Sequence, residues 1–282
     1  MDKNEVKLLL KELNLHPRKS LGQNFIINNQ ILFKLISEAD ISNQDVILEV
    51  GPGLGALTAE LVKTAGKVIA VEIENRLYDF LQKKFSDIDN LKLINGDILE
   101  IALPYHNKMV SNIPYSITGP LFEKLFFKKD APEGILIIEK NIADRILYTE
   151  NYKNFSRITV SVNSFMKSTY HRKISKNAFY PRPKIDLTLI HLFPREDLDP
   201  LMFHDEFKQF YLQFIAGIMP YKNKNMVNAI YLYTKRYMNN PLNKDLIKGI
   251  LKRLNLKNLK VFEFNIEQFM ELGKAFYKLN LP

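Results

Sequence analysis

From residue 46 onward, short apolar runs alternate with amphipathic stretches, and this alternation most constrains the fold. The apolar runs at residues 46–50, 68–73, 91–94, 109–111 and 135–138 predict strands, and the stretches at 57–62, 76–85, 121–127 and 142–147 predict helices. Strands that are apolar along their whole length are typical of a parallel sheet covered by helices on both faces. We therefore expect an α/β, Rossmann-like fold with a mostly parallel sheet.

The two ends of the chain have a different pattern. Residues 1–15 and 30–39 have helical periodicity, and a basic, turn-forming segment at 16–25 separates them. Two late strand candidates, 165–170 and 187–193, are expected to form an edge hairpin. Prolines and acidic residues at 194–200 interrupt the pattern, and phenylalanines at helical spacing follow. We predict a catalytic domain at 1–194, which includes an N-terminal cofactor and RNA segment at 1–28, and a small all-helical domain at 195–282.

Composition narrows the class of protein. The 282 residues contain no cysteine, which excludes disulfides, thiol catalysis and cysteine-ligated zinc, and fits a cytoplasmic setting. There is no apolar run of eighteen residues and no signal-peptide pattern, so we expect no membrane partner. The formal charge is +9, and residues 140–176 carry eight Lys or Arg against two acidic residues. Such a stretch suits a polyanion such as RNA, or is simply a solvated surface.

A glycine loop follows the first predicted strand. Gly51 and Gly53 permit a tight turn and a close approach of a ligand to the backbone. The loop also satisfies the pattern of dinucleotide binders, with Glu72 about twenty residues on, where an acidic residue would hold a ribose. Glu49 favours a cationic ligand over a pyrophosphate, and Asp97, at the end of the third strand, can accept a hydrogen bond from an adenine amine. The balance favours a nucleoside-like cation such as S-adenosylmethionine.

The tetrapeptide Asn112-Ile113-Pro114-Tyr115 is suited to chemistry on an aromatic amine. The Asn112 side-chain oxygen, and the carbonyl of Ile113 or of Pro114, can accept hydrogen bonds from the exocyclic amine of adenine, which localises its lone pair. Tyr115 offers an aromatic face for stacking, and Phe179 a second one. In-line methyl transfer by positioning needs no metal ion. The alternative without a catalytic role is that the tetrapeptide is a simple turn and that Phe179 is a core residue.

These motifs together resemble the KsgA-type small-subunit rRNA adenine N6,N6-dimethyltransferases. The resemblance runs from about residue 17 to 193, with a weaker helical similarity to about 260. It rests on the order and spacing of Arg18-Lys-Ser-Leu-Gly-Gln-Asn-Phe25, Glu49-Val-Gly-Pro-Gly-Leu-Gly55, Val71-Glu72, Gly96-Asp97, Asn112-Ile-Pro-Tyr115, Ala143-Asp-Arg145 and Phe179-x-Pro-x-Pro-x-Ile-Asp186. It implies a class I methyltransferase fold and dimethylation, by S-adenosylmethionine, of two adjacent adenosines near the 3′ end of small-subunit rRNA, during ribosome biogenesis.

The same resemblance implies roles for cofactor-binding residues. Asn24 and Ile26 are expected to close over the cofactor, and Gly51 to lie against its methionine part. Glu72 is expected to hold the ribose and Asp97 the adenine amine. The family usually has Leu where Ile26 stands, and residues 139–143 and 221–226 also depart from its pattern, the latter being less basic.

For the target, the resemblance implies that Asn112 borders both cofactor and base, and that Tyr115 and Phe179 hold the base. Expected partners are small-subunit rRNA or the immature small subunit, bound by a monomer. Four alternatives stay open: an antibiotic-resistance methylase of large-subunit rRNA, a DNA adenine N6-methyltransferase, an RNA-binding assembly checkpoint, and a NAD-dependent oxidoreductase.

Overall fold

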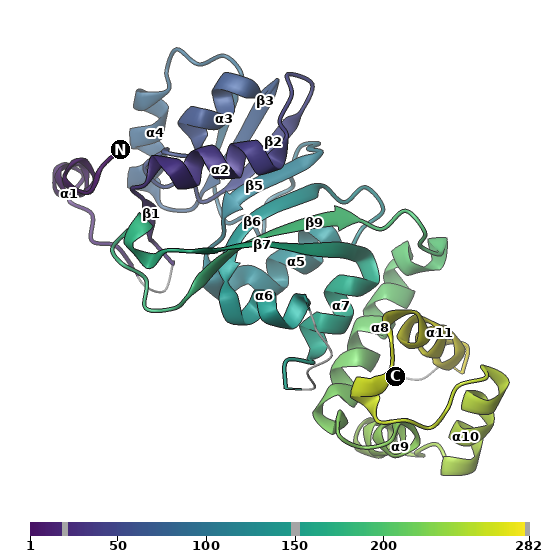
Figure 1. Cartoon of the computed structure of the whole chain (residues 1–282). Coiled ribbons are helices and arrows are strands. Elements are labelled where there is room, and N and C mark those ends of the chain that lie inside the picture. Colours follow the sequence, from purple (N-terminus) through teal and green to yellow (C-terminus); the bar gives the residue numbers. More distant parts are fainter. Residues whose placement is uncertain (19–21, 148–152, 280–282) are drawn as a thin grey trace. The chain divides into compact units, whose positions relative to one another are not determined.

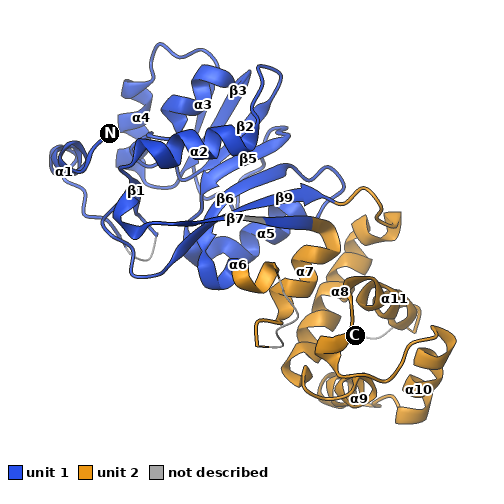
Figure 2. Cartoon of the chain, viewed as in Figure 1, with its two compact units in different colours: residues 1–143, 167–194 blue, residues 144–166, 195–282 orange. Residues whose placement is uncertain are grey.

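The computed structural model describes residues 1–18, 22–147 and 153–279. The chain divides into two compact units, Met1–Ala143 with Lys167–Pro194, and Asp144–Met166 with Arg195–Pro282 (Figure 2). Residues 144–166 thus group with the C-terminal helices, while the division into domains at 1–194 and 195–282 remains a prediction. Lys19, Ser20 and Leu21 of the basic N-terminal motif, and Glu150 of the basic stretch, lie outside the described residues.

A seven-stranded sheet with the order β4-β3-β2-β5-β6-β9-β7 forms the centre of the first unit (Figure 1). Its first five strands pair in parallel, and β9 runs antiparallel to β6. The mostly parallel sheet is therefore confirmed, and the two late strands lie at its edge as predicted. The strands are β2 (Val46–Val50), β3 (Lys67–Glu72), β4 (Leu91–Asn95), β5 (Lys108–Asn112), β6 (Glu133–Glu139), β7 (Met166–Ile174) and β9 (Leu187–Pro194).

Helices cover the sheet because the central strands are apolar on both sides. Figure 1 shows α2 and α3 on one face and α5 on the other. Leu35 of α2 and Leu61 of α3 are buried in one cluster with Ile47, Val110 and Ile137 of the strands. The helices of this unit are α1 (Lys3–Glu12), α2 (Asn29–Ala39), α3 (Thr58–Thr64), α4 (Asn75–Lys84), α5 (Thr118–Phe126) and the first part of α6 (Lys140–Ile146).

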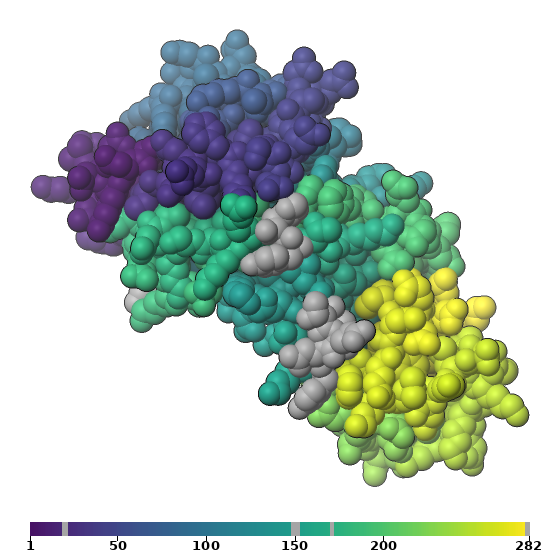
Figure 3. Space-filling view, viewed as in Figure 1, coloured from purple at the N-terminus to yellow at the C-terminus, as the bar shows by residue number. Residues whose placement is uncertain are grey.

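The N-terminal segment packs against the first unit. The Asp2 side chain caps α1, and Val6 and Leu10 of this helix are buried in a cluster with Phe25 and Leu54. Phe25–Ile26 forms β1, which pairs antiparallel with β8, Phe179–Tyr180, and the ammonium groups of two α1 lysines lie 5.7 and 6.0 Å from the Tyr180 ring centroid. In Figure 3 the purple N-terminal residues accordingly border the green segment that contains β8.

The second unit is helical. Its helices are α7 (Arg157–Phe165), α8 (Asp205–Ile218), α9 (Met226–Tyr237), α10 (Lys244–Arg253) and α11 (Ile266–Tyr277), with the end of α6. Buried aromatic rings form its core, among them Phe207, Phe214, Phe269 and Phe276. These rings come from the apolar faces of α8 and α11, which explains the helical spacing of phenylalanines in the sequence. The all-helical character expected for residues 195–282 agrees with this unit.

Candidate functional site

Three neighbouring strands bring most of the predicted site residues to one edge of the sheet. β2 ends at Val50, β3 beside it ends at Glu72, and β5 on its other side ends at Asn112. The carboxyl ends of adjacent parallel strands meet at one edge, which is where open α/β sheets bind ligands. The fold therefore places the glycine loop between Glu72 and Asn112.

The glycine loop turns sharply back over the end of β2. Gly51 and Gly53 have φ angles of +69° and +60°, a region that favours glycine. The Gly51 N–H donates to the Val71 carbonyl at 2.9 Å, and the Gly53 N–H donates to Glu72 Oε2 at 3.1 Å. A Cβ at Gly53 would lie 3.0 Å from the Phe25 ring, so a side chain there would crowd that ring.

Two buried carboxyl groups flank this loop. Glu49 and Glu72 are 2% and 3% exposed. Burial, together with the nearby Glu72 charge, raises the pKa of Glu49 to about 8, although Thr58 donates a hydrogen bond to its Oε2 at 2.7 Å. Burial also raises the pKa of Glu72, against hydrogen bonds from the backbone of Glu74 and Gly53. Two buried acids at a pocket whose described lining residues contribute no Lys, Arg or His side chain form an environment in which a cationic ligand is stabilised.

Asn112 presents an unused acceptor at the same edge. Its Nδ2 donates to the Asn24 carbonyl at 3.2 Å. Its Oδ1 is buried and has no hydrogen-bond partner among the described residues. Because a buried acceptor without a partner is unfavourable, this oxygen is positioned to accept from a ligand donor. In the same tetrapeptide, the Ile113 N–H donates to the Ile137 carbonyl, and the Pro114 carbonyl accepts a hydrogen bond from the Ile117 N–H.

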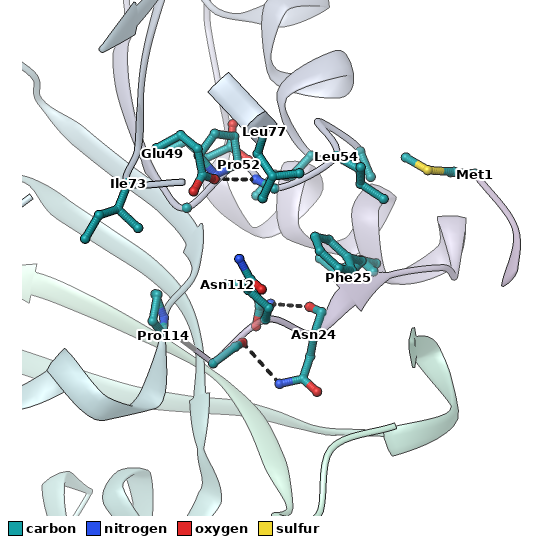
Figure 4. Close-up of a pocket in the computed structure, with 18 residues that line it drawn as sticks. Met1, Asn24, Phe25, Glu49, Pro52, Leu54, Ile73, Leu77, Asn112 and Pro114 are labelled. Atoms are coloured by element: carbon teal, nitrogen blue, oxygen red, sulfur yellow. Dashed lines mark hydrogen bonds between the residues drawn. The ribbon is translucent and has the colours of Figure 1, made fainter. Parts of the chain in front are cut away.

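One pocket collects these groups (Figure 4). In the close-up, Asn24 and Asn112 lie side by side, and Glu49 and Pro52 lie across the pocket from them. The glycine loop and the tetrapeptide therefore open onto the same space. The predicted residues that line it are Asn24, Ile26, Glu49, Gly51, Gly53, Glu72, Asn112 and Pro114.

Three other predicted residues are not among those that line this pocket. The Asp97 carboxylate accepts from the Leu99 N–H at 2.8 Å, in the manner of a local cap. Tyr115 packs against the core cluster that contains Phe179, which is 2% exposed. Burial raises the pKa of the Tyr115 hydroxyl; Asn24 offsets this slightly, yet no hydrogen bond of ordinary geometry reaches that oxygen within the described residues.

The pocket also contains residues that the sequence did not single out. Gly22 and Gln23 approach it before β1, and Met1 reaches it from the N-terminus. Ile73 follows Glu72 directly and is 46% exposed, so it offers an apolar surface beside a carboxylate. The position of Ile73 directly after Glu72, the residue expected to hold the ribose, is the sequence signal that could have identified it. None of the described residues that line the pocket contributes a Lys, Arg or His side chain.

Two other kinds of feature are absent from the described part of the chain. Among residues 1–18, 22–147 and 153–279, no three or more His, Cys, Asp or Glu side chains gather as ligands for a metal ion. In the same ranges, no helix is long and apolar enough to cross a membrane.

Comparison with known proteins gives consistent results. A family model described as ribosomal RNA adenine dimethylase matches residues 14–270. A relative from Thermococcus sibiricus, named probable ribosomal RNA small subunit methyltransferase A, is 32% identical over 95% of both chains. A relative from Borrelia garinii subsp. bavariensis, named ribosomal RNA small subunit methyltransferase A, is 35% identical over 95% of this chain and 92% of its own. A crystal structure of a dimethyladenosine transferase from Plasmodium falciparum has a TM-score of 0.79 and 26% identity, covering 91% of this chain and 98% of its own. The expected class I methyltransferase fold is confirmed.

Proposed function

The chain belongs to the ribosomal RNA adenine dimethylase family, and we propose that it dimethylates N6 of two adjacent adenosines near the 3′ end of small-subunit rRNA. Its cofactor is S-adenosylmethionine, which supplies a methyl group on a positively charged sulfur. The observation that carries the proposal is the unpartnered Oδ1 of Asn112, which shares a pocket with Glu49 and Glu72.

The residues around the glycine loop fit such a cofactor. Glu49 and Glu72 are buried, and their raised pKa values fall when a cation binds beside them. The bends at Gly51 and Gly53 let a ligand approach the backbone. The absence of basic side chains from the described lining argues against a pyrophosphate and hence against a NAD-dependent oxidoreductase.

The residues of the tetrapeptide fit the target amine. Asn112 Oδ1 accepts an N–H of the adenine amine, which localises the nitrogen lone pair. A monomethylated amine keeps one N–H, so the same oxygen serves a second transfer. Tyr115 and Phe179 are proposed to hold the base, and this requires their shared cluster to open because Phe179 is buried. Asp97 is proposed to meet the adenine amine of the cofactor.

The charge distribution supports an RNA partner. Residues 222–260 carry ten Lys or Arg and one acidic residue, Asp245, a local excess that equals the +9 of the whole chain. A basic surface of this kind attracts the phosphate backbone. We propose that the partner is the immature small subunit, that the chain acts in the cytoplasm, and that it acts as a monomer. Family membership does not favour a large-subunit methylase or a purely RNA-binding checkpoint.

Labelled-methyl transfer tests the proposal. Immature small subunits that lack the modification, large subunits and duplex DNA are each incubated with the protein and labelled cofactor, and the nucleosides are then analysed. The expected product is N6,N6-dimethyladenosine from small subunits alone. Label in large-subunit RNA or in DNA, with none in small subunits, contradicts the proposal.

A further inference from the structure

We propose that Gly22 is a positioning residue for methyl transfer. Its backbone lies directly against the Asn112–Tyr115 tetrapeptide and holds it in place. The carbonyl of Asn24, two residues further on, fixes which end of the Asn112 side-chain amide faces the target amine. The inference rests on the proposed function, because it concerns the orientation of the amide that accepts from that amine. It assigns a role to a residue that contacts neither amide atom itself.

The Asn112 amide has two ends with opposite hydrogen-bonding character. The end that faces the Asn24 carbonyl must be the NH₂ group, since a carbonyl oxygen accepts and cannot donate; the observed Nδ2···O distance is 3.2 Å. The other end, Oδ1, is therefore the one left buried and unpartnered. With the amide reversed, a donor would face the target amine and could not accept its N–H. The Asn24 carbonyl thus selects the reactive arrangement.

Gly22 holds the tetrapeptide from the same segment. It has a φ of +60°, and a Cβ built on it would lie 3.1 Å from Pro114 Cα, 3.3 Å from the Tyr115 nitrogen and 3.4 Å from Pro114 Cβ. Two of these three neighbours are backbone atoms, and the third belongs to a proline ring, so none can rotate away. The absence of a side chain at Gly22 therefore allows two backbone segments to lie directly against each other.

Hydrogen bonds within the segment of residues 22–26 link the Gly22 contact with the tetrapeptide to the Asn24 contact with the Asn112 amide. Asn24 Nδ2 donates to the Gly22 carbonyl at 3.1 Å, which ties the two positions. Gln23 Oε1 accepts from the Arg18 N–H at 2.7 Å, which ties Gln23 to Arg18. Ile26 then pairs with Phe179 in the two-stranded sheet. A methyl group at Gly22 would therefore push the tetrapeptide away from a segment that cannot follow it.

The expected consequence is a loss of alignment with little loss of cofactor binding. A misplacement of about 1 Å at a reacting centre can reduce the rate by about 100-fold. The carboxylates of Glu49 and Glu72 belong to other elements, and neither contributes any of the three atoms nearest to a Cβ at Gly22.

The test compares Gly22→Ala and Gly22→Val with Gly119→Ala. Gly119 is the second residue of helix α5 and has no positive φ, and a Cβ there meets nothing within 4 Å, so Gly119→Ala controls for the added methyl group. Three quantities are measured: the affinity for S-adenosylhomocysteine, kcat and KM on immature small subunits, and the binding of adenosine monophosphate against purine riboside monophosphate to the S-adenosylhomocysteine-saturated protein. The last pair differs only in the exocyclic amine.

For Gly22→Ala we expect kcat to fall about 10- to 100-fold, with a cofactor affinity within about threefold of wild type. For Gly22→Val we expect a larger fall in kcat. The wild-type preference for the amine-bearing nucleotide, about tenfold for one buried hydrogen bond, should shrink toward one in Gly22→Ala and persist in Gly119→Ala. Unchanged kcat and amine preference in Gly22→Ala would overturn the inference, as would a wild type with no amine preference. An intact amine preference without methylation of small subunits would instead refute the proposed function alone.

Discussion

The buried carboxyl group of Glu49 leads to a quantitative prediction for Glu49→Gln. Glutamine keeps the acceptor oxygen that Thr58 uses, at 2.7 Å in the wild type, but cannot ionise. The folded-state pKa of Glu49 is about 8, against the usual 4.5 that the unfolded chain provides. The carboxyl group therefore favours the folded state fully below pH 4.5, and this contribution is lost as the pH rises toward 8.

The magnitude follows from the difference between these two pKa values. Each pH unit between them changes the free energy of unfolding by about 1.4 kcal/mol. Between pH 5 and pH 8, ionisation of Glu49 should thus lower the stability of the cofactor-free wild type by about 3 to 4 kcal/mol more than that of Glu49→Gln. Titrating groups that do not interact with Glu49 are common to both proteins and cancel in the comparison, whereas Glu72 and Lys84 are coupled to Glu49.

Two assays measure this effect. Urea unfolding of both proteins at pH 5 and pH 8 gives the difference in stability. Calorimetry of S-adenosylmethionine binding at pH 7, in buffers of different ionisation enthalpy, gives proton release. Glu49 of the wild type should release about 0.9 proton to the buffer, because a group with a pKa near 8 is mostly protonated at pH 7 and ionises when a cation binds beside it. Glu49→Gln should release about 0.9 proton fewer than the wild type, because only Glu72 is left to ionise, and should bind more weakly. Parallel stability curves for the two proteins, or equal proton release, would refute the reasoning.

Two further predictions concern the target. Tyr115→Phe should keep most of the activity because no hydrogen bond of ordinary geometry engages the hydroxyl among the described residues. Tyr115→Ala should lose about 10- to 100-fold in kcat/KM because the stacking surface is removed. Equal losses of the two variants in steady-state assays would argue against a stacking role. Replacing the exposed Lys252, Arg253 and Lys257 with Gln should weaken binding to small-subunit rRNA and reduce the slope of log affinity against log salt by about 2; an unchanged slope in filter binding would place the RNA contact elsewhere.

Much of the first unit could be predicted from the sequence because the signal is local. Strands β2, β3 and β5 are short apolar runs in the sequence, and each carries Glu, Gly or Asn at or near its carboxyl end. Parallel pairing alone brings these ends together. That argument located Glu49, Glu72 and Asn112 at one pocket without any knowledge of side-chain positions.

Other features depend on contacts between distant residues. The two-residue pairing of Phe25–Ile26 with Phe179–Tyr180 has no periodicity to detect. Helix α7, Arg157–Phe165, contains β-branched residues that do not suggest a helix, yet its side chains are buried on several sides, and a capping box at Ser156 and Thr159 starts it. The orientation of the Asn112 amide depends on a carbonyl 88 positions earlier in the chain.

Asn112→Ala tests the proposed chemistry most directly, because it removes the side-chain acceptor that joins the cofactor pocket to the target amine. The variant is assayed by nucleoside analysis of immature small subunits and, separately, by S-adenosylhomocysteine titration. The account predicts that the wild type forms N6,N6-dimethyladenosine, whereas the variant forms none and keeps its cofactor affinity within a few-fold. Normal dimethyladenosine formation by Asn112→Ala would contradict it.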